Sequence, residues 1–229
     1  MPSNRVRPLT SGATRNEDRP NPCEVKHQQG ARKTQEMNKS IADLFGSEYK
    51  ISMPLSGVAA SWFERKSEGK FAFLDYDVKK GLKWSMTFYR DEGKKEVLLS
   101  VEQKKLAPLA GQSGYEFADS NGKVLGAWVP KKRFLNLFLK AGYELVVDGK
   151  TIAKSPAEGF FKLFIPSAVR KMIARNVLTA DGKAIAKVRA VSTLGCGTVT
   201  VKPDNGKIPD DFMATSVAVF GAICGLQDV

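Results

Sequence analysis

The sequence predicts a mainly β domain in which an antiparallel barrel encloses an apolar C-terminal helix. Three observations lead to this prediction. Short runs of aromatic and β-branched residues follow one another from Tyr49 onward, a strand–turn–strand unit recurs, and the last apolar run, 212–226, is almost uninterrupted. Runs of the first kind are typical of strands, and a segment that is apolar on all sides belongs in a protein core or in a membrane.

Residues 1–40 differ in composition from the rest of the chain. They are rich in Pro, Asn, Arg, Gln and Ser and poor in large apolar residues. Such a segment buries too little surface to offset the entropy lost on ordering. Its arginines are not followed by the apolar stretch of a secretory signal. We therefore predict a disordered polar tail over 1–40 and one folded domain over 41–229, which opens with a short helix near Ser40.

The first strands of the domain are predicted within the segments KFAFLDYDV, KWSMTFYR and KEVLLSVEQ. Several segments alternate apolar with polar residues, which is the period of a half-buried strand. Alternation places Asp75 and Asp77 on one strand face, where we expect solvated outer positions. Further along, the Gly-x-Gly at 195–197 has no third glycine and no helix after it. It therefore predicts a bend or bulge in a strand rather than a dinucleotide site.

One strand–turn–strand unit occurs at 115–129, 143–155 and 176–190, with a degenerate fourth copy at 198–209. Each unit has a strand, an Asn-Gly or Asp-Gly step, a lysine, and then an apolar strand with Gly or Ala two residues in. The Asn-Gly and Asp-Gly steps favour tight hairpin turns because both residues tolerate positive φ. Regular hairpins with a shared spacing predict an all-β barrel or sandwich.

The segment 160–176 interrupts this β pattern. Its second half predicts a connecting helix that starts at Ser167 and has an apolar face flanked by basic residues. The apolar residues are Val169, Met172 and Ile173, and the flanking basic residues are Arg170, Lys171 and Arg175.

The apolar run at 212–226 predicts a helix inside the protein core. A helix of this length is about 22 Å long, whereas the hydrocarbon core of a bilayer is about 30 Å thick. Acidic residues flank the run, and membrane anchors usually have basic or aromatic flanks. Asp210 and Asp211 also suit the start of a helix, where the dipole is positive. The small residues within the run favour close packing on all sides; they are Ala214, Ala218, Gly221, Ala222 and Gly225.

Composition favours an anionic partner and offers little for catalysis. The formal net charge is +12 and the pI is about 9.6, which favours nucleic acid or an anionic membrane surface. The three cysteines are widely spaced, which predicts reduced thiols and a cytoplasmic location. His27 is the one histidine, so histidine-based zinc sites and catalytic triads would depend on it alone. We expect no enzyme activity, no cofactor and no metal.

The motifs at 115–126, 143–149 and 204–212, followed by the apolar run, resemble the tubby-like superfamily. This superfamily includes the LURP-one-related proteins and the phospholipid scramblases. The resemblance covers residues 49–228 and implies a closed antiparallel barrel of roughly twelve strands around a central C-terminal helix. It also implies binding of phosphoinositides through basic residues.

The chain departs from the scramblase pattern at two places. Scramblases have an acidic, calcium-binding segment before the last helix, but here Lys207 stands among Asp204, Asp210 and Asp211. Calcium prefers six to eight oxygen ligands, so this lysine argues against a calcium site. The acylated cysteine cluster of some scramblases is also absent, and Cys23 alone is a weak candidate for palmitoylation.

Two basic groups are the candidate site for anionic lipid. Basic clusters beside aromatic residues suit anionic headgroups, and each cation near the surface contributes about 1 kcal/mol. The first group follows Trp128-Val129-Pro130 in the sequence, and the second belongs to the predicted connecting helix. The site residues are Lys131, Lys132, Arg133, Arg170, Lys171 and Arg175.

The leading hypothesis is a non-enzymatic cytoplasmic protein that binds anionic membrane lipids peripherally. Two alternatives stay open. The first is a phospholipid scramblase whose last helix enters the bilayer. The second is a soluble scaffold whose basic face binds protein or nucleic acid, although no RNA-binding or zinc motif is visible.

Overall fold

The structure is a computed structural model, and residues 40–229 form one compact unit. The described residues are 41–54, 61–79, 83–105, 113–131, 142–157, 174–193 and 196–228. The predicted tail at 1–40 lies outside them, as do Cys23, His27 and most of the predicted helix that starts at Ser167.

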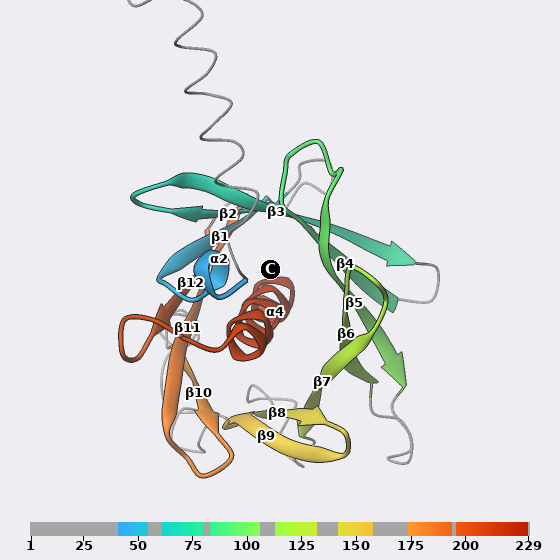
Figure 1. Cartoon of the computed structure of the whole chain (residues 1–229), viewed down its shortest axis with the longest axis vertical. Coiled ribbons are helices and arrows are strands. Elements are labelled where there is room, and N and C mark those ends of the chain that lie inside the picture. The colour runs from blue at the N-terminus through green and yellow to red at the C-terminus, as the bar shows by residue number, and fades with distance from the viewer. Residues whose placement is uncertain are drawn as a thin grey trace, which may run out of the picture. The chain divides into compact units, whose positions relative to one another are not determined.

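The described residues form twelve strands and two helices. Every neighbouring pair of strands is antiparallel, and hydrogen bonds between β12 and β1 close the barrel around α4 (Figure 1). The prediction of a closed antiparallel barrel around the C-terminal helix is confirmed. The elements are α2 (Ile41–Phe45), β1 (Tyr49–Pro54), β2 (Ser61–Arg65), β3 (Gly69–Lys79), β4 (Lys83–Tyr89), β5 (Val97–Lys105), β6 (Ser113–Asp119), β7 (Val124–Lys131), β8 (Gly142–Val147), β9 (Lys150–Ser155), β10 (Arg175–Thr179), β11 (Ala184–Thr193), β12 (Cys196–Pro203) and α4 (Asp211–Asp228).

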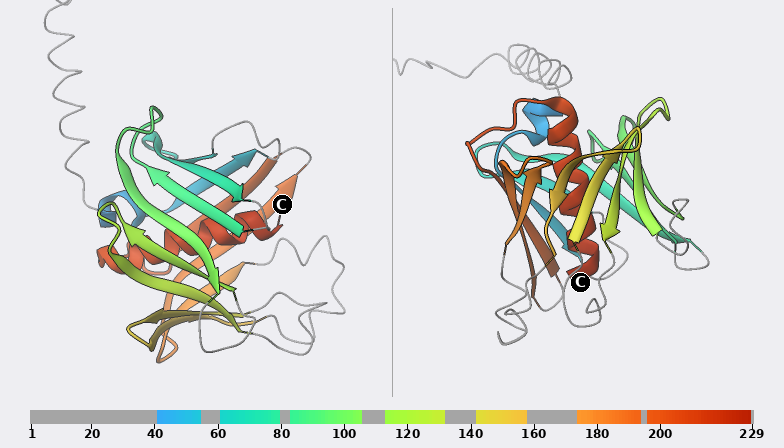
Figure 2. Two further views of the ribbon diagram at one scale, coloured as in Figure 1. Left: turned by 90° about the vertical axis from the view of Figure 1, so that its right-hand side faces the viewer. Right: turned by 90° about the horizontal axis from the view of Figure 1, so that it is seen from below.

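The barrel has two distinct ends. Successive strands are antiparallel neighbours, so successive connections alternate between the ends. One end, which we call the α2 end, holds α2, the first turn of α4 and the turns of the hairpins β6–β7, β8–β9 and β10–β11. The C-terminus of α4 lies at the other end, which we call the far end (Figure 2). Lys131 closes β7 and Arg175 opens β10, so both lie at the far end.

The three predicted hairpins are confirmed as β6–β7, β8–β9 and β10–β11. Each has a register shift at the same point of the unit, and the residue before the shift faces the small residue of the returning strand. The facing pairs are Phe117 with Gly126, Leu145 with Ala153, and Val177 with Ala186. At Gly126 a Cβ would lie 3.1 Å from the carbonyl oxygen of Val146, so the crowded interior explains the recurring Gly or Ala.

The turns use their glycines differently from the prediction. Only Asp148 and Gly149 both have positive φ, at 49° and 76°. In the other two hairpins only Gly122 and Gly182 do, and a side chain organises the rest of the turn. The fourth copy is not a hairpin, because β12 leads through its turn directly into α4. The organising bonds run to Asp119 Oδ1 from the amides of Asn121 and Lys123, and to Thr179 Oγ1 from the amide of Lys183.

Helix α4 starts and lies as the sequence predicts. The carboxylate of Asp210 accepts a hydrogen bond from the amide of Met213 at 2.6 Å, which caps the helix N-terminus. Residues 214–225 are all buried. Among the described residues, no helix combines the length and the apolar character that crossing a membrane requires.

Side-chain size sets the orientation of α4 within the barrel. Its small face lies against β1, β11 and β12, the strands that it approaches most closely. There a Cβ on Gly221 would lie only 3.1 Å from Val201 Cγ2 and 3.2 Å from Ile51 Cδ1. On its large face, the Phe220 ring lies 4.6 Å from the Trp128 ring, and Trp128 Nε1 donates to the Ser216 carbonyl at 2.8 Å.

Helix α2 closes the α2 end with an aromatic cluster. The ring of Phe45 lies 5.2 Å from Phe63 and 5.9 Å from Tyr49, in edge-to-face contacts. Phe71 and Phe88 complete the cluster. Edge-to-face pairs of this kind add to the stabilisation that burial of the rings provides.

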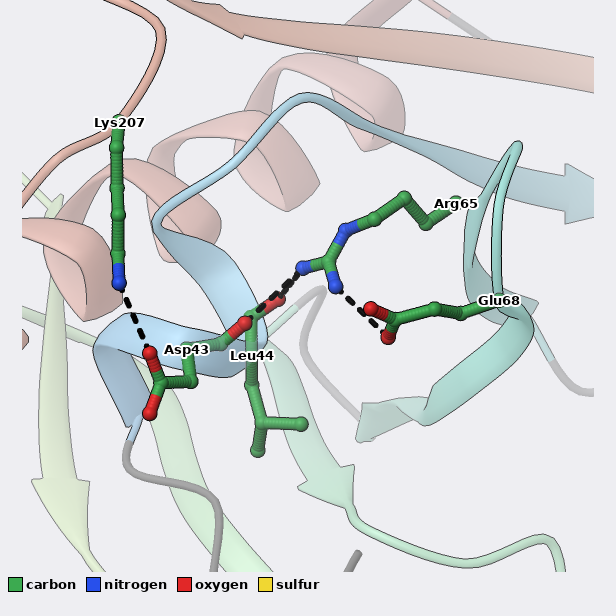
Figure 3. A network of polar contacts seen from close by, with 5 residues as sticks. All are labelled: Asp43, Leu44, Arg65, Glu68 and Lys207. Atoms are coloured by element: carbon green, nitrogen blue, oxygen red, sulfur yellow. Dashed lines mark hydrogen bonds and ion pairs between the residues drawn. The ribbon is translucent and has the colours of Figure 1, made fainter.

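A polar network holds the backbone of α2 in place (Figure 3). Arg65 Nη2 donates to the carbonyls of Asp43 and Leu44 at 3.1 and 2.7 Å, and its Nη1 pairs with Glu68 at 2.8 Å. Lys207 pairs with the Asp43 carboxylate at 2.9 Å, which ties α2 to the segment before α4. The bonds from Arg65 satisfy carbonyls that a helix end leaves without partners.

We expect Tyr49→Phe to stabilise the domain, and most strongly at alkaline pH. The buried hydroxyl of Tyr49 has no hydrogen-bond partner, so its removal should raise the free energy of unfolding by about 1 kcal/mol. Burial raises the pKa of Tyr49 above its usual 10.0, against the opposing charge of Arg65. Above pH 10.0, the usual pKa of tyrosine, the unfolded chain loses the hydroxyl proton of Tyr49 and the folded protein keeps it. The free energy of unfolding therefore falls by about 1.4 kcal/mol for each unit of rising pH.

Urea unfolding of the wild type and Tyr49→Phe between neutral pH and pH 11 tests this expectation. Tyr89→Phe, at a half-buried position, is the control for loss of a tyrosine hydroxyl. Parallel pH profiles for the wild type and Tyr49→Phe would contradict the assignment.

Candidate anion-binding surface

Of the six site residues predicted from the sequence, Lys131 and Arg175 lie among the described residues. Lys131 is on the outer face of β7. Its side chain is 62% exposed, and its Nζ lies 2.6 Å from Glu144 Oε1, so its charge is already paired. Lys132, Arg133, Arg170 and Lys171 lie outside the described residues.

The prediction that Arg175 belongs to a connecting helix is wrong. It is the first residue of β10 and pairs with Val188 of β11. Strand alternation places it on the same face as the buried Val177, and its guanidinium carbon lies 6.0 Å from the centre of the Tyr143 ring. Lys131 points outward and Arg175 inward, so these two residues do not form one surface.

A different set of cations lies together on the outside of β11, β12 and β1. The inner neighbours of these residues along each strand, such as Ile51, Val188 and Val201, are buried in the core. Alternation therefore turns the cations outward, and all are exposed. We call this set the basic wall; it consists of Lys50, Lys187, Arg189 and Lys202.

Strand register makes the basic wall compact. Lys187 lies directly opposite Lys202, while Thr200 stands between Arg189 on one side and Lys50 on the other. None of the four cations forms an ion pair with a described residue. Directly opposite side chains have Cβ atoms about 5 Å apart, and like charges at that distance are destabilising. An anion placed between them would relieve this repulsion.

Carboxylates on the outer faces of β3, β6 and β8 pair with nearby lysines. Asp75 and Asp77 lie on the outer face of β3, as predicted, because they alternate with the buried Leu74 and with Tyr76, which packs against the core. Lys94 pairs with Asp75 at 2.7 Å, and Lys104 pairs with Glu116, a hydrogen bond that raises the pKa of Lys104. In the closed strand order, β5, β6 and β7 lie across the barrel from β11, β12 and β1. On the outer faces of β5 and β7, Lys104 and Lys131 are paired with carboxylates, whereas the basic wall has no ion pair with a described residue.

The sequence contains only a weak signal for the basic wall. Lys187 and Arg189 alternate with small apolar residues in the third repeat, which indicates one outward face. Lys50 and Lys202 are far apart in the chain, and only the pairing of β1 with β12 brings them together. The prediction from the sequence named runs of adjacent basic residues instead, because such runs can be recognised without knowledge of strand register.

A groove of about 390 Å³ is the other candidate feature, at the α2 end. It lies between the β10–β11 turn and the start of α4, with Ile208 and Met213 among its apolar residues. Two of its charged residues have partners in the fold, because Lys207 pairs with Asp43 and Asp210 caps α4. Among the described residues, no group of three His, Cys, Asp or Glu side chains could hold a metal ion.

Comparison of the chain with models of known protein families gives no match, and comparison with curated proteins gives none either.

Proposed function

We propose that the protein is a non-enzymatic, peripheral membrane protein of the cytoplasm that binds anionic phospholipids through the basic wall. The observation that carries this proposal is the set of exposed cations, without ion pairs among the described residues, on three neighbouring strands. Cations near an anionic bilayer contribute about 1 kcal/mol each. The resemblance to the tubby-like superfamily supports the same class of ligand.

The arrangement of charge favours a lipid surface over a simple solubility role. A solvated surface gains nothing from placing Lys187 opposite Lys202, whereas a layer of phosphates removes the repulsion between them. Binding of this kind weakens with salt, because the Debye length falls from about 10 Å at 0.1 M to about 3 Å at 1 M.

We expect the triple variant K187Q/R189Q/K202Q to bind anionic vesicles roughly a hundredfold more weakly than the wild type, since each lost cation costs about 1 kcal/mol. The matched control is K94Q/K104Q/K131Q, which removes the same number of charges from lysines that are already paired. The control should bind almost as well as the wild type. Co-sedimentation with vesicles of phosphatidylcholine and phosphatidylserine measures both.

Two outcomes would count against the proposal. If both triple variants weaken binding equally, net charge rather than the basic wall is responsible. If the wild type does not bind anionic vesicles at low salt, the lipid function is wrong.

The variant K131Q/K132Q/R133Q tests the basic group that the sequence predicts.

The basic wall also suits a second partner, a nucleic-acid backbone, which would make the protein a soluble scaffold. Competition between vesicles and single-stranded RNA for the wild type separates the two. A scramblase role would require α4 to leave the barrel, although residues 214–225 fill its core. For that reason we do not propose it.

A further inference from the structure

We infer that the barrel docks on a flat anionic bilayer by its side, with Trp62 as an aromatic anchor at the edge of the basic wall. This inference rests on the proposed function and adds the orientation of the molecule and a residue that enters the interface. It commits to a bilayer as the partner, because a flat surface can contact several strands at once.

Trp62 continues the basic wall onto the next strand. In β2 the flanking residues Ser61 and Phe63 are buried inside the barrel, so Trp62 faces outward, half-buried. Its partner across the strand pair is Ser52 of β1, and Lys50 faces Glu64 two residues further along. Trp62 is therefore one strand away from Lys50, on the same outer surface.

The surroundings of Trp62 suit the boundary between water and lipid. The Nζ of Lys70 lies 4.0 Å from the centre of its ring, and the indole Nε1 donates to Glu64 Oε2 at 3.2 Å. The indole thus has a polar edge held by the protein and an apolar body beside an exposed cation. Tryptophan is enriched at membrane interfaces for this reason, and a neighbouring lysine reaches toward the headgroups.

Charge at the α2 end argues against docking by that end. It has acidic residues on the β4–β5 turn and around the start of α4, which an anionic membrane would repel. They are Asp91, Glu92, Glu96, Asp204, Asp210 and Asp211. At the far end, Lys104 and Lys131 are paired with carboxylates and Arg175 faces inward, while Lys79 pairs with Lys83 in the ladder of β3 and β4. The side formed by β11, β12, β1 and β2 combines exposed cations, without ion pairs among the described residues, with an outward-facing tryptophan, which favours contact there.

The three tryptophans of the chain report three different places. Trp62 is on the proposed docking side. Trp84 is the second residue of β4, at the far end, on the inner face with Met86 and Phe88, and is half-buried. Trp128 is fully buried against α4. Quenching of tryptophan fluorescence by brominated lipid chains therefore distinguishes side-on from end-on docking.

The experiment compares the wild type, Trp62→Phe and Trp84→Phe on vesicles of brominated phosphatidylcholine and phosphatidylserine in equal parts. We expect quenching of the wild type and of Trp84→Phe on binding, and its loss in Trp62→Phe. Co-sedimentation of the same samples shows whether each protein is bound. Unchanged thermal unfolding shows that Trp62→Phe is folded.

Each other result overturns a defined part of the inference. Quenching that disappears with Trp84→Phe places the far end on the membrane. Sedimentation without quenching of any tryptophan rejects the anchor but keeps the proposed function. Absence of sedimentation rejects the proposed function and, with it, the docking.

A second variant separates anchoring from a structural role. Trp62→Ser should weaken binding to vesicles while leaving binding to heparin, a soluble polyanion, unchanged. If both weaken equally, Trp62 supports the shape of the basic wall instead of entering the bilayer, and the anchor is wrong.

Discussion

Gly221→Arg is expected to abolish soluble expression of the domain. Gly221 is buried where α4 meets the barrel wall, and even a single Cβ there would lie 3.1 Å from Val201 and 3.2 Å from Ile51. An arginine has neither room nor a charge partner at this position. A buried unpaired charge costs several kcal/mol, which is comparable to the whole stability of a domain. Ala218→Arg should have the same effect, because Ala218 is fully buried.

Smaller substitutions should give a graded series. Gly221→Ala should destabilise the domain by about 1–3 kcal/mol, since the neighbours must move by a few tenths of an ångström. Gly225→Ala should cost more, because its Cβ would lie 2.2 Å from Met53 Sδ and 2.9 Å from Val199 Cγ2. Ser100→Arg is the control, since it adds the same side chain to the outer face of β5, where Ser100 lies between Thr87 and Ala118.

Soluble yield and thermal unfolding by circular dichroism measure the series. If Gly221→Arg were folded with the melting temperature of the wild type, α4 would not be enclosed by the barrel. A membrane-anchor role for 212–226 predicts, in contrast, that deletion of this segment leaves a folded domain.

Local signals explain why so much of the fold follows from the sequence. The start of α4 is set by Asp210, whose carboxylate caps the first turn. The three hairpins are marked by Gly122, Gly149 and Gly182, which adopt positive φ at little cost. The small residues of α4 indicate close packing before any contact is known. Each of these signals acts within a few residues, so the sequence shows it directly.

The pairing register of the strands is the part of the fold that the sequence does not show. The chain beyond Ser167 has a helical pattern, yet Arg175 pairs with Val188 in a β ladder, and only the neighbouring strand determines this. The basic wall likewise depends on Lys50 and Lys202, which pairing of the first and last strands brings together. A pattern along the chain cannot show which strand closes a barrel.

The basic wall and the most tightly packed part of the core belong to the same strands. Val199 and Val201 point inward against Gly225 and Gly221 of α4, while Thr200 and Lys202 alternate with them and point outward. Burial of apolar surface on the inner face can therefore offset the repulsion between cations on the outer face. Substitutions that remove the outer cations should leave the fold intact, which makes the vesicle experiment interpretable.

Phe45→Ala is expected to destabilise the domain by about 3–5 kcal/mol, which is the usual cost of deleting a buried phenylalanine ring. The Phe45 side chain is fully buried, and the rings of Tyr49, Phe63, Phe71 and Phe88 surround it. Its helix has only five residues, too few to be stable alone, so tertiary contacts must hold it.

The polar network around α2 provides the matched comparison (Figure 3). Asp43→Asn weakens the pair with Lys207, whose side chain is 54% exposed, and should cost less than about 1 kcal/mol. Arg65→Met removes the donor to the carbonyls of Asp43 and Leu44 and should fall between the two. Urea unfolding measures all three variants. We expect the loss of unfolding free energy to be largest for Phe45→Ala, intermediate for Arg65→Met and smallest for Asp43→Asn. This order would show that the aromatic cluster stabilises this end of the barrel. The largest loss for Asp43→Asn would show instead that the surface ion pair does.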